Sequence, residues 1–290
     1  MTERDRWINW GLFVLLALIW GSSFILMQIG KDAGLDGIQI GSLRILAAGV
    51  VFVPFALVLG RRIPRRKLPL VALSGVLGNL LPAYLFATAI GRVSSALEGI
   101  LNSLTPLFVV IVGALFFGVR LPRRKLAGVL IGFLGLVALT LKSGFGVSDI
   151  GYVLLVLLAT LLYGINVNLV NQYLKGLDPI AMATVSLSIV AVPAAFVVAQ
   201  GGLLSMALHD EAARVGIAAS ALLGLIGSAV ATALFYLLIK RAGGLFASLV
   251  TYAIPVVAIG WGLLAGEHIS LFQMGCLGII LGGVYLGNKS

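Results

Sequence analysis

The chain has 290 residues, of which 60% are hydrophobic and only 10% are charged. Soluble domains carry roughly 25% charged residues, so the composition excludes a soluble protein, and it excludes a disordered one because disordered chains are polar. The net charge of +10 does not indicate nucleic-acid binding, because most basic residues lie in short runs between long apolar stretches.

Ten apolar stretches have about the length that a helix needs to cross a bilayer, which is roughly 20 residues. In chain order they cover 8–29, 38–59, 68–90, 94–119, 126–141, 150–171, 179–200, 215–239, 245–265 and 269–286. The fifth is short and is expected to begin near Pro122. The first is too long for a signal-peptide core, so it is expected to be retained. The sequence predicts an all-α integral membrane protein with ten transmembrane helices.

The basic residues predict the orientation of these helices. If the N-terminus is cytoplasmic, fifteen Lys and Arg residues lie on the cytoplasmic side and only four on the other, as the positive-inside rule requires. The pentapeptide PRRKL occurs in two of the cytoplasmic turns, at 64–68 and 122–126. We expect both termini to be cytoplasmic, in a multi-pass protein of a bacterial inner membrane, with these turns also near anionic lipid.

An internal repeat divides the chain. The segment GLDGI at 34–38 returns as GLDPI at 176–180, 142 residues later, and Pro106 and Pro255 occupy matching helices. The fifth and tenth helices are both glycine-rich, and pairs such as 128/132 and 278/282 are expected to permit close backbone approach. These matches predict two five-helix repeats, 1–143 and 144–290. An odd number of crossings inverts the second, an arrangement typical of secondary transporters.

Arg44 and Glu98 are the ionisable residues inside the apolar stretches. A charge at membrane depth costs about 3 kcal/mol or more, so each is expected to face protein or a water-filled interior. Their similar depth allows them to pair or to face one vestibule. In the functional interpretation Arg44 attracts a substrate carboxylate, and Glu98 meets an amine or takes a proton. The structural alternatives are a buried pair that fixes helix packing and a favourable position for Glu98 near a helix N-terminus.

Polar stripes end at a proline in the fourth and ninth expected helices. They consist of Glu98, Asn102 and Thr105 before Pro106, and of Ser248, Thr251 and Tyr252 before Pro255. The spacing places each stripe on one helix face, and a proline kinks a helix and frees a carbonyl. We expect both stripes to line a central cavity. The alternative is hydrogen bonding between helices.

Further polar and aromatic residues at membrane depth extend this candidate pathway. They are Trp20, Ser23, Asn79, Tyr84, Tyr163, Asn166, Thr232 and Tyr236. For each of them taken alone, helix packing is the alternative.

The chain lacks the sequence patterns of the common membrane-bound enzymes and motors. It contains no GxxxxGK[ST], HExxH or GxSxG motif, and its two histidines, His209 and His268, lie in expected loops. We therefore expect no enzyme activity, no metal and no cofactor. An integral-membrane enzyme or a structural subunit is the alternative of a different class. The single cysteine, Cys276, is expected to be a packing residue.

The sequence resembles the drug/metabolite transporter superfamily, EamA-domain type, over essentially its whole length. The resemblance rests on WGSSF at 20–24, on Arg44 within SLRIL at 42–46, on Tyr84, on 96–106, on Gly266-Glu267 and on the glycine-rich fifth and tenth helices. The first repeat departs from the pattern, with Gly118-Val119-Arg120 where a Gly-Glu pair is typical. Ser186 is the approximate counterpart of Arg44, so a charge at that position belongs to one repeat.

The resemblance implies a ten-helix bundle that works by alternating access, with lipid as its surroundings and a small molecule as its partner. The chain looks most like bacterial amino-acid exporters of the YddG type, which makes amino acids the expected substrates. Drug efflux or nucleotide-linked metabolite transport is the alternative. Small multidrug antiporters of this superfamily use an acidic residue in their first helix, and none lies there. A fused duplication permits a monomer and does not exclude a dimer.

Overall fold

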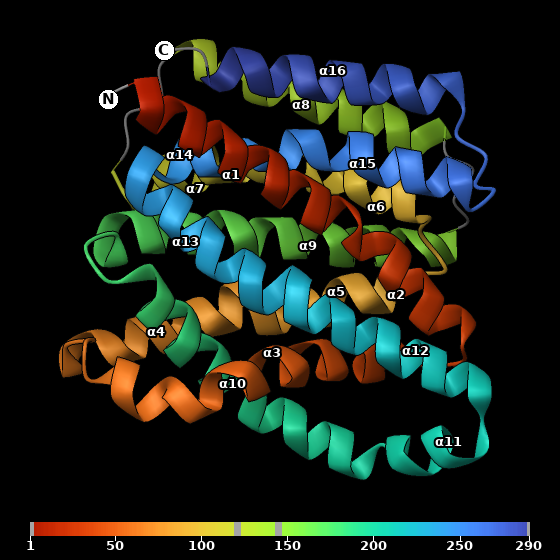
Figure 1. Ribbon diagram of the computed structural model, residues 1–290. Coiled ribbons are helices and arrows are strands. Elements are labelled where there is room, and N and C mark those ends of the chain that lie inside the picture. The colour runs from red at the N-terminus through yellow and green to blue at the C-terminus, as the bar shows by residue number, and fades with distance from the viewer. Residues whose placement is uncertain (1–2, 119–122, 143–146, 289–290) are drawn as a thin grey trace.

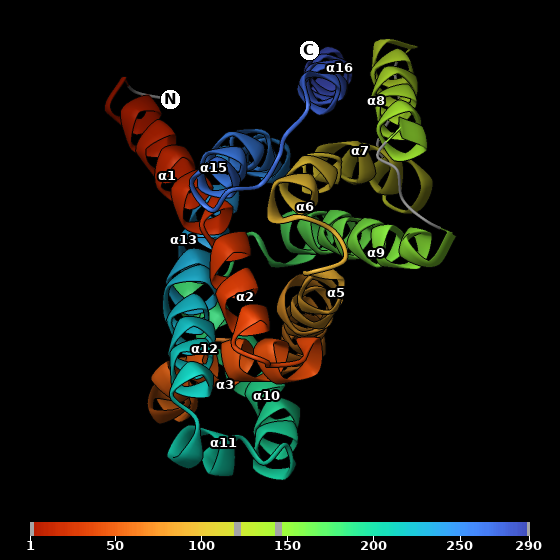
Figure 2. The same ribbon diagram turned by 90° about the vertical axis from the view of Figure 1, so that its right-hand side faces the viewer.

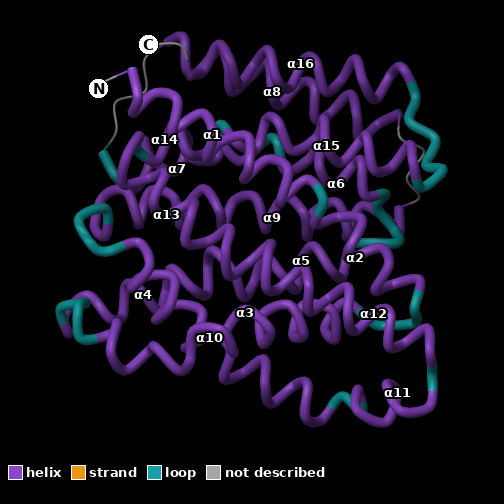
Figure 3. The backbone as a smooth tube through the Cα atoms, in the orientation of Figure 1, coloured by secondary structure: helices purple, strands orange, loops and turns teal. Residues whose placement is uncertain are grey.

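The computed structural model describes residues 3–118, 123–142 and 147–288. Within these ranges every regular element is helical, and short loops join the helices (Figures 1 and 3). The first half contains α1 (Glu3–Gly21), α2 (Ser23–Asp32), α3 (Gly37–Gly60), α4 (Leu68–Gly75), α5 (Leu81–Ala89), α6 (Ser95–Asn102), α7 (Thr105–Phe116) and α8 (Arg123–Lys142). It also contains a 3₁₀ turn, η1 (Arg65–Lys67), and a π-helix, η2 (Val76–Leu80).

The second half has the same character. Its α-helices are α9 (Val147–Leu169), α10 (Pro179–Gln200), α11 (Leu203–His209), α12 (Glu211–Leu222), α13 (Ala231–Ala242), α14 (Gly244–Ser248), α15 (Val250–Leu264) and α16 (Leu271–Asn288). The π-helix η3 (Val170–Leu174) continues α9, and the π-helix η4 (Leu223–Val230) joins α12 to α13.

Each of the ten expected stretches coincides with helix in the structure. Eight helices are long and apolar enough to cross a membrane when segments that continue one another are counted together. Neither α8 nor α16 is among the eight, and the apolar part of α16 covers Leu271–Gly283. The structure therefore supports eight crossings among the described residues, and the count of ten stays a prediction. Pro122 lies outside the described residues, and α8 begins at Arg123.

The outer surface of the bundle is apolar. Leu57, Leu264 and Leu271 are all more than 80% exposed, as are many other large apolar side chains to a smaller degree. Water-soluble monomers rarely expose apolar surface on this scale. The helices therefore present a surface suited to lipid.

Helix pairing follows a two-fold pattern. The most extensive contacts join α3 to α10 and α8 to α16, which are the second and seventh and the fifth and tenth expected helices. The third expected helix (α5) packs on the sixth (α9), and in the corresponding contact the eighth (α13) packs on the first (α1). The fourth packs on the sixth (α7 on α9) as the ninth packs on the first (α15 on α1). Exchanging each helix for the one five places along leaves this set of contacts unchanged.

Glycines allow the α3–α10 and α8–α16 pairs to approach closely. A Cβ added at Gly49 of α3 would lie 2.2 Å from the Ala191 Cβ of α10. A Cβ added at Gly283 of α16 would lie 2.4 Å from the backbone nitrogen of Gly132 in α8. Of the two glycine pairs that the sequence pointed to, Gly128 and Gly132 lie in this contact, whereas Gly278 and Gly282 face open space. The α8–α16 pair lies along one edge of the bundle, next to α7 (Figures 1 and 2).

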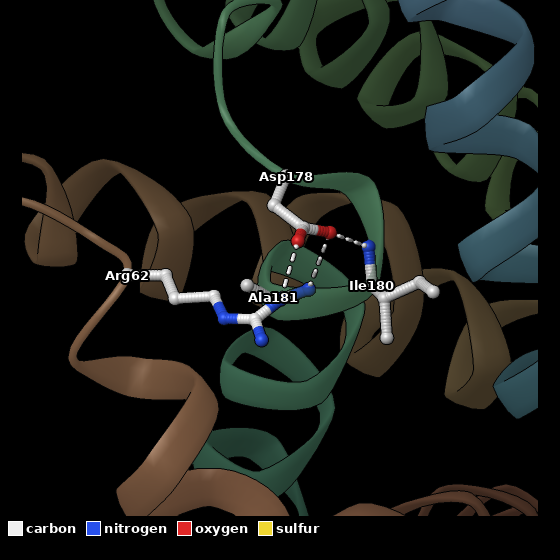
Figure 4. Close-up of polar contacts among 4 residues, drawn as sticks. All are labelled: Arg62, Asp178, Ile180 and Ala181. Carbon is white, nitrogen blue, oxygen red and sulfur yellow. Dashed lines mark hydrogen bonds and ion pairs between the residues drawn. The ribbon is translucent and has the colours of Figure 1, made fainter.

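The repeated aspartates begin the paired helices α3 and α10. Asp178 caps α10 by accepting hydrogen bonds from the backbone nitrogens of Ile180 and Ala181, and it forms an ion pair of 3.0 Å with Arg62, just after α3 (Figure 4). Partial burial opposes the charged carboxylate, but the backbone donors and the Arg62 guanidinium outweigh it, so the pKa of Asp178 lies below its ordinary value. The cap and the ion pair thus tie the start of α10 to the end of α3.

The start of α1 and the end of α16 lie at the same end of the bundle (Figure 1). Arg241, in the last turn of α13, forms an ion pair of 2.9 Å with Asp5 near the start of α1. Lys67 donates a hydrogen bond of 2.7 Å to the backbone oxygen of Tyr173. These contacts place turns from both halves on the same side, which is the arrangement that the positive-inside argument needs.

Candidate substrate cavity

An internal cavity lies between the two halves of the chain. The first half supplies Trp20, Ser23, Phe24, Met27, Arg44, Gly78, Asn79, Phe86, Asn102 and Thr105, and the second supplies Tyr163, Asn166, Val167, Gly227, Thr232, Phe235, Tyr236, Ser248, Thr251 and Ile254. The volume of the cavity that the centre of a water molecule can occupy is about 70 Å³. One ordered water needs about 10–15 Å³ on this measure, so the cavity has room for a small solute.

The wall is built where helices are interrupted. The break between α6 and α7 falls at Ser103 and Leu104, and the break between α14 and α15 falls at Leu249. At each break a threonine hydroxyl donates to the backbone oxygen three residues earlier, from Thr105 to Asn102 and from Thr251 to Ser248, both at 2.8 Å. All four of these residues line the cavity, so matching interruptions in the two halves expose matching polar groups.

The prolines lie beyond these interruptions rather than at them. Pro106 is in the first turn of α7, where a residue without a backbone N–H is tolerated and the preceding residue is disfavoured in a helix. Pro255 lies inside α15, six residues after Leu249. Neither proline lines the cavity, so neither contributes a side chain to the wall, and a kink at either one stays a prediction.

Trp20 connects the first helix to the second half. Its indole Nε1 donates a hydrogen bond of 3.0 Å to the backbone oxygen of Gly227 in η4. Its ring also packs edge-on against Phe235, with centroids 5.0 Å apart. A π-helix leaves carbonyls with altered partners and occurs often at functional sites. The wall here joins α1 to η4 through one side chain.

A buried hydrogen-bond network forms one side of the cavity. Thr232 donates to the Asn79 side-chain oxygen at 2.9 Å, across the two halves. Ser74 donates to the Asn166 side-chain oxygen at 2.7 Å and lies 2.9 Å from the Tyr236 hydroxyl. Because Ser74 has one hydroxyl hydrogen, Tyr236 is the donor in that second bond. Neutral groups hold this side of the wall together.

Arg44 is the one charged side chain among the lining residues. Its Nε donates a hydrogen bond of 2.8 Å to Ser228 of η4, and the side chain is 8% exposed. A Cβ added at Gly224 would lie 2.2 Å from the Arg44 backbone oxygen, so α3 packs tightly against η4 at this level. Arg44 forms no ion pair with any residue that the structure describes. The pairing considered between Arg44 and Glu98 is therefore absent.

Glu98 lies away from the cavity wall, fully buried in α6. Neither of its carboxyl oxygens has a hydrogen-bond partner among the described residues. Glu267 lies beyond the start of the same helix, where its carboxylate accepts from the backbone nitrogens of Ser95 and Ala96, both at 3.2 Å, and from the Ser95 hydroxyl. The carboxylate that occupies the N-terminus of α6 is thus Glu267, from the loop after α15.

Two further residues of the expected pathway lie outside the wall. Tyr84 bonds Ser42 at 3.0 Å, between α5 and α3, and Tyr252 packs against the apolar core. The other expected pathway residues line the cavity: Trp20, Ser23, Arg44, Asn79, Asn102, Tyr163, Asn166, Thr232, Tyr236, Ser248 and Thr251. Among the described residues, no group of His, Cys, Asp or Glu side chains is arranged to hold a metal ion.

Apolar side chains complete the wall, and the sequence did not single them out. Phe86 lies between Phe24 and Tyr163, with ring centroids 5.7 and 6.1 Å away. In a helix that is apolar on every side, a phenylalanine facing a cavity has the same sequence context as one facing lipid. Pairing of helices in space, which a single sequence does not display, decides which of them line the wall.

Comparison with known proteins places the chain in a family. A model of the EamA-like transporter family matches it twice, over residues 8–141 and 150–288. The chain belongs to the EamA-like transporter family. It is accordingly a multi-pass membrane protein and a transporter of that family.

Relatives of this EamA-like chain span nearly its full length. It is 28% identical to an uncharacterized transporter of Archaeoglobus fulgidus over 96% of this chain and 98% of that protein. It is 27% identical to the uncharacterized inner membrane transporter YedA of Escherichia coli over 95% of this chain and 89% of YedA. Over 47% of this chain and 45% of the relative, it is 30% identical to a probable terminal-alkyne amino-acid exporter of Streptantibioticus cattleyicolor.

A solved structure shares the fold. It superimposes with a TM-score of 0.63 over 95% of this chain and 94% of that one, at 18% sequence identity. At this identity the likeness concerns the fold alone.

Proposed function

We propose that the protein is a secondary transporter that exports amino acids or similar small metabolites through the central cavity. The observation that carries the proposal is the composition of the wall, to which each half of the chain contributes equally at matching helix interruptions. Broken helices with polar groups at a repeat interface are how secondary transporters build binding sites. The family membership supports the transporter function, and the cavity is the proposed binding site for the solute.

The proposed mechanism is alternating access by two inverted repeats, 1–143 and 144–290, with ten crossings and cytoplasmic termini. The two-fold pattern of helix pairing and the double match to the family support the repeat. The shared location of basic turns from both halves supports the orientation. Exchanging the packing of the two repeats would open the same cavity to the opposite side.

Size and chemistry favour a small polar solute. The room for a solute is limited, and amides, hydroxyls and aromatic rings share the wall. The partial relative named as a probable amino-acid exporter adds to this, as does the resemblance to exporters of the YddG type. The YedA relative, named as an inner membrane transporter, supports a place in a bacterial inner membrane. Drug efflux is the alternative, and the counterflow experiment described next distinguishes it from amino-acid export.

Counterflow in proteoliposomes tests the proposal. Vesicles are loaded with one unlabelled amino acid at a time, and uptake of the labelled compound is followed without an ion gradient. We expect saturable exchange for a subset of amino acids. Exchange of lipophilic cations in place of amino acids would overturn the substrate class. Folded protein that exchanges no solute of either kind would overturn the transport proposal for this cavity.

A further inference from the structure

Arg44 presents unused hydrogen-bond donors to the cavity. A guanidinium has five N–H donors in a fixed fork, and among the described residues only Ser228 accepts from it, through Nε. Arg44 lines the cavity. None of its nitrogens is both fully buried and without a hydrogen-bond partner. The terminal nitrogens therefore face the space that a solute would occupy. Two parallel donors of this kind match the two oxygens of a carboxylate.

The charge of Arg44 is not balanced within the wall. Among the residues that the structure describes, no Asp, Glu or Lys lines the cavity, and Glu98 neither lines it nor pairs with Arg44. The wall thus carries one positive charge in surroundings where an unpaired charge is costly. A solute with one negative group balances it, whereas a doubly charged phosphate would leave an excess negative charge. One arginine without a second cation favours a carboxylate.

The helix interruptions add to the positive potential. α7 starts at Thr105, which lines the cavity, and α15 starts at Val250, next to the lining residue Thr251. The N-terminus of a helix carries partial positive charge, and the N-termini of broken helices point at anionic substrate groups in other membrane transporters. Two helix N-termini and one guanidinium thus surround the same space.

We propose that Arg44 binds the carboxylate of the transported solute and that this carboxylate is required for transport. The inference rests on the proposed function and narrows it. To a solute's amino group the described wall offers neutral groups, namely amide and hydroxyl oxygens and the faces of aromatic rings. Neutral amino acids and simple monocarboxylates therefore fit, while basic amino acids bring a second positive charge that no acidic residue of the wall balances.

Matched pairs of solutes test the requirement without altering the protein. Leucine, phenylalanine and threonine are each compared with their carboxamides as competitors in counterflow, and inorganic phosphate and lysine are added as further competitors. We expect each carboxamide to compete at least about tenfold less well than its acid, in line with loss of a charge-assisted bond. Equal competition by acid and amide would overturn the inference while leaving transport intact. Strong competition by phosphate alone would overturn the assignment of carboxylate.

Variants at Arg44 provide the second arm. Arg44→Gln is expected to remove the preference for acid over amide, and Arg44→Lys to retain part of it. Ligand-induced change in thermal stability in detergent, with the same acids and amides, reports binding even where counterflow is lost. A folded Arg44→Gln protein that still prefers the acid would contradict the proposal. Absence of exchange for every solute, with selective stabilisation by acids, would instead count against the proposed transport function.

Discussion

Arg44 of α3 and Ser228 of η4 share a hydrogen bond of 2.8 Å, although 184 residues separate them in the sequence. The bond holds the guanidinium at the cavity wall and links the two halves of the chain. Its partner lies in a π-helix, where the backbone departs from regular α-helix. The position of the charge is therefore set by a contact between the repeats.

Ser228→Ala removes the acceptor from Arg44. We expect the free energy of unfolding to fall by about 1.5–3 kcal/mol, as for other bonds to charged groups, and KM for carboxylate solutes to rise several-fold because Arg44 is free to turn. Ser220→Ala is the matched control, since Ser220 is buried and its one partner among the described residues is Gly216 of its own helix. Thermal unfolding and counterflow kinetics measure both effects. Equal KM values for the two variants would contradict the positioning role.

Glu98→Leu is expected to stabilise the protein. A buried polar group without a hydrogen-bond partner costs about 1–3 kcal/mol, and Glu98 has two such oxygens. We predict a higher midpoint of thermal unfolding, with counterflow retained because Glu98 does not line the cavity. Glu267→Leu is the contrasting variant and should lower the midpoint, because Glu267 accepts from the first backbone nitrogens of α6.

A proton-carrying role for Glu98 makes the opposite prediction for transport. Under that role, Glu98→Gln abolishes the pH dependence of counterflow. Retention of the full pH dependence in Glu98→Gln shows that Glu98 is not the coupling site, and loss of it would contradict the purely structural account given for Glu98→Leu.

Gly283→Ala should loosen the pair formed by α8 and α16. Its added methyl group meets the Gly132 nitrogen at 2.4 Å and the Gly128 oxygen at 2.7 Å. Both contacts are backbone, so relief requires the helices to separate, at a cost of about 1–3 kcal/mol. Gly282→Ala, one residue earlier, meets nothing within 4 Å and should be neutral. Thermal unfolding of the two variants side by side decides the point, and an equal loss in both would count against this packing.

Asp178 predicts a change of stability at acid pH. Its pKa in the folded protein lies below the ordinary value of 3.8, so the unfolded state binds the proton more tightly. The stabilisation is complete above about pH 5 and is lost as pH falls through the folded pKa. The difference in thermal midpoint between the wild type and Asp178→Asn should therefore be constant near neutral pH and shrink on acidification. A difference that grows on acidification would contradict the assignment.

Arg62→Gln separates the two contributions at Asp178. The ion pair is well exposed, with 60% of the Arg62 side chain accessible, and exposed pairs contribute about 0.2–1 kcal/mol. We expect a smaller loss of stability in Arg62→Gln than in Asp178→Ala, which removes the cap of α10 as well. Thermal unfolding at neutral pH compares them. A larger effect for Arg62→Gln would show that the ion pair outweighs the cap.

Spacing in the sequence was enough to find much of the polar wall. Asn102, Ser248 and Thr251 lie at helical intervals before a proline, and the structure brings all three to one cavity. Glu98 and Tyr252 belong to the same stripes but lie outside it. Glu98 is in the first turn of α6, one turn before Asn102, and Tyr252 follows Thr251 directly in α15, so its side chain points about 100° away around the helix. Spacing along the sequence gives the shared face of a stripe, but it does not give how far along that face the cavity extends.

Other features depend on contacts between helices. Ser74, which bonds Asn166 and Tyr236, is a serine in an apolar helix with no marker of its own in the sequence. The glycine that allows α16 to touch α8 is Gly283 and not Gly282. Both glycines lie in the same run, and only the rotation of the helix about its axis chooses between them. That rotation follows from the packing of the whole bundle.

The central claim is that one cavity opens in turn to each side of the membrane, and two-sided labelling of a single cysteine tests it most directly. Cys276, the only cysteine of the chain, is replaced by serine, and Thr251→Cys in the wall is treated with a membrane-impermeant thiol reagent in right-side-out and inside-out vesicles. Ala194→Cys, fully buried in α10, is the control.

We predict labelling of Thr251→Cys from both sides, slowed by transported amino acids, and no labelling of Ala194→Cys. Labelling from one side only, in protein that still performs counterflow, would contradict alternating access through this cavity.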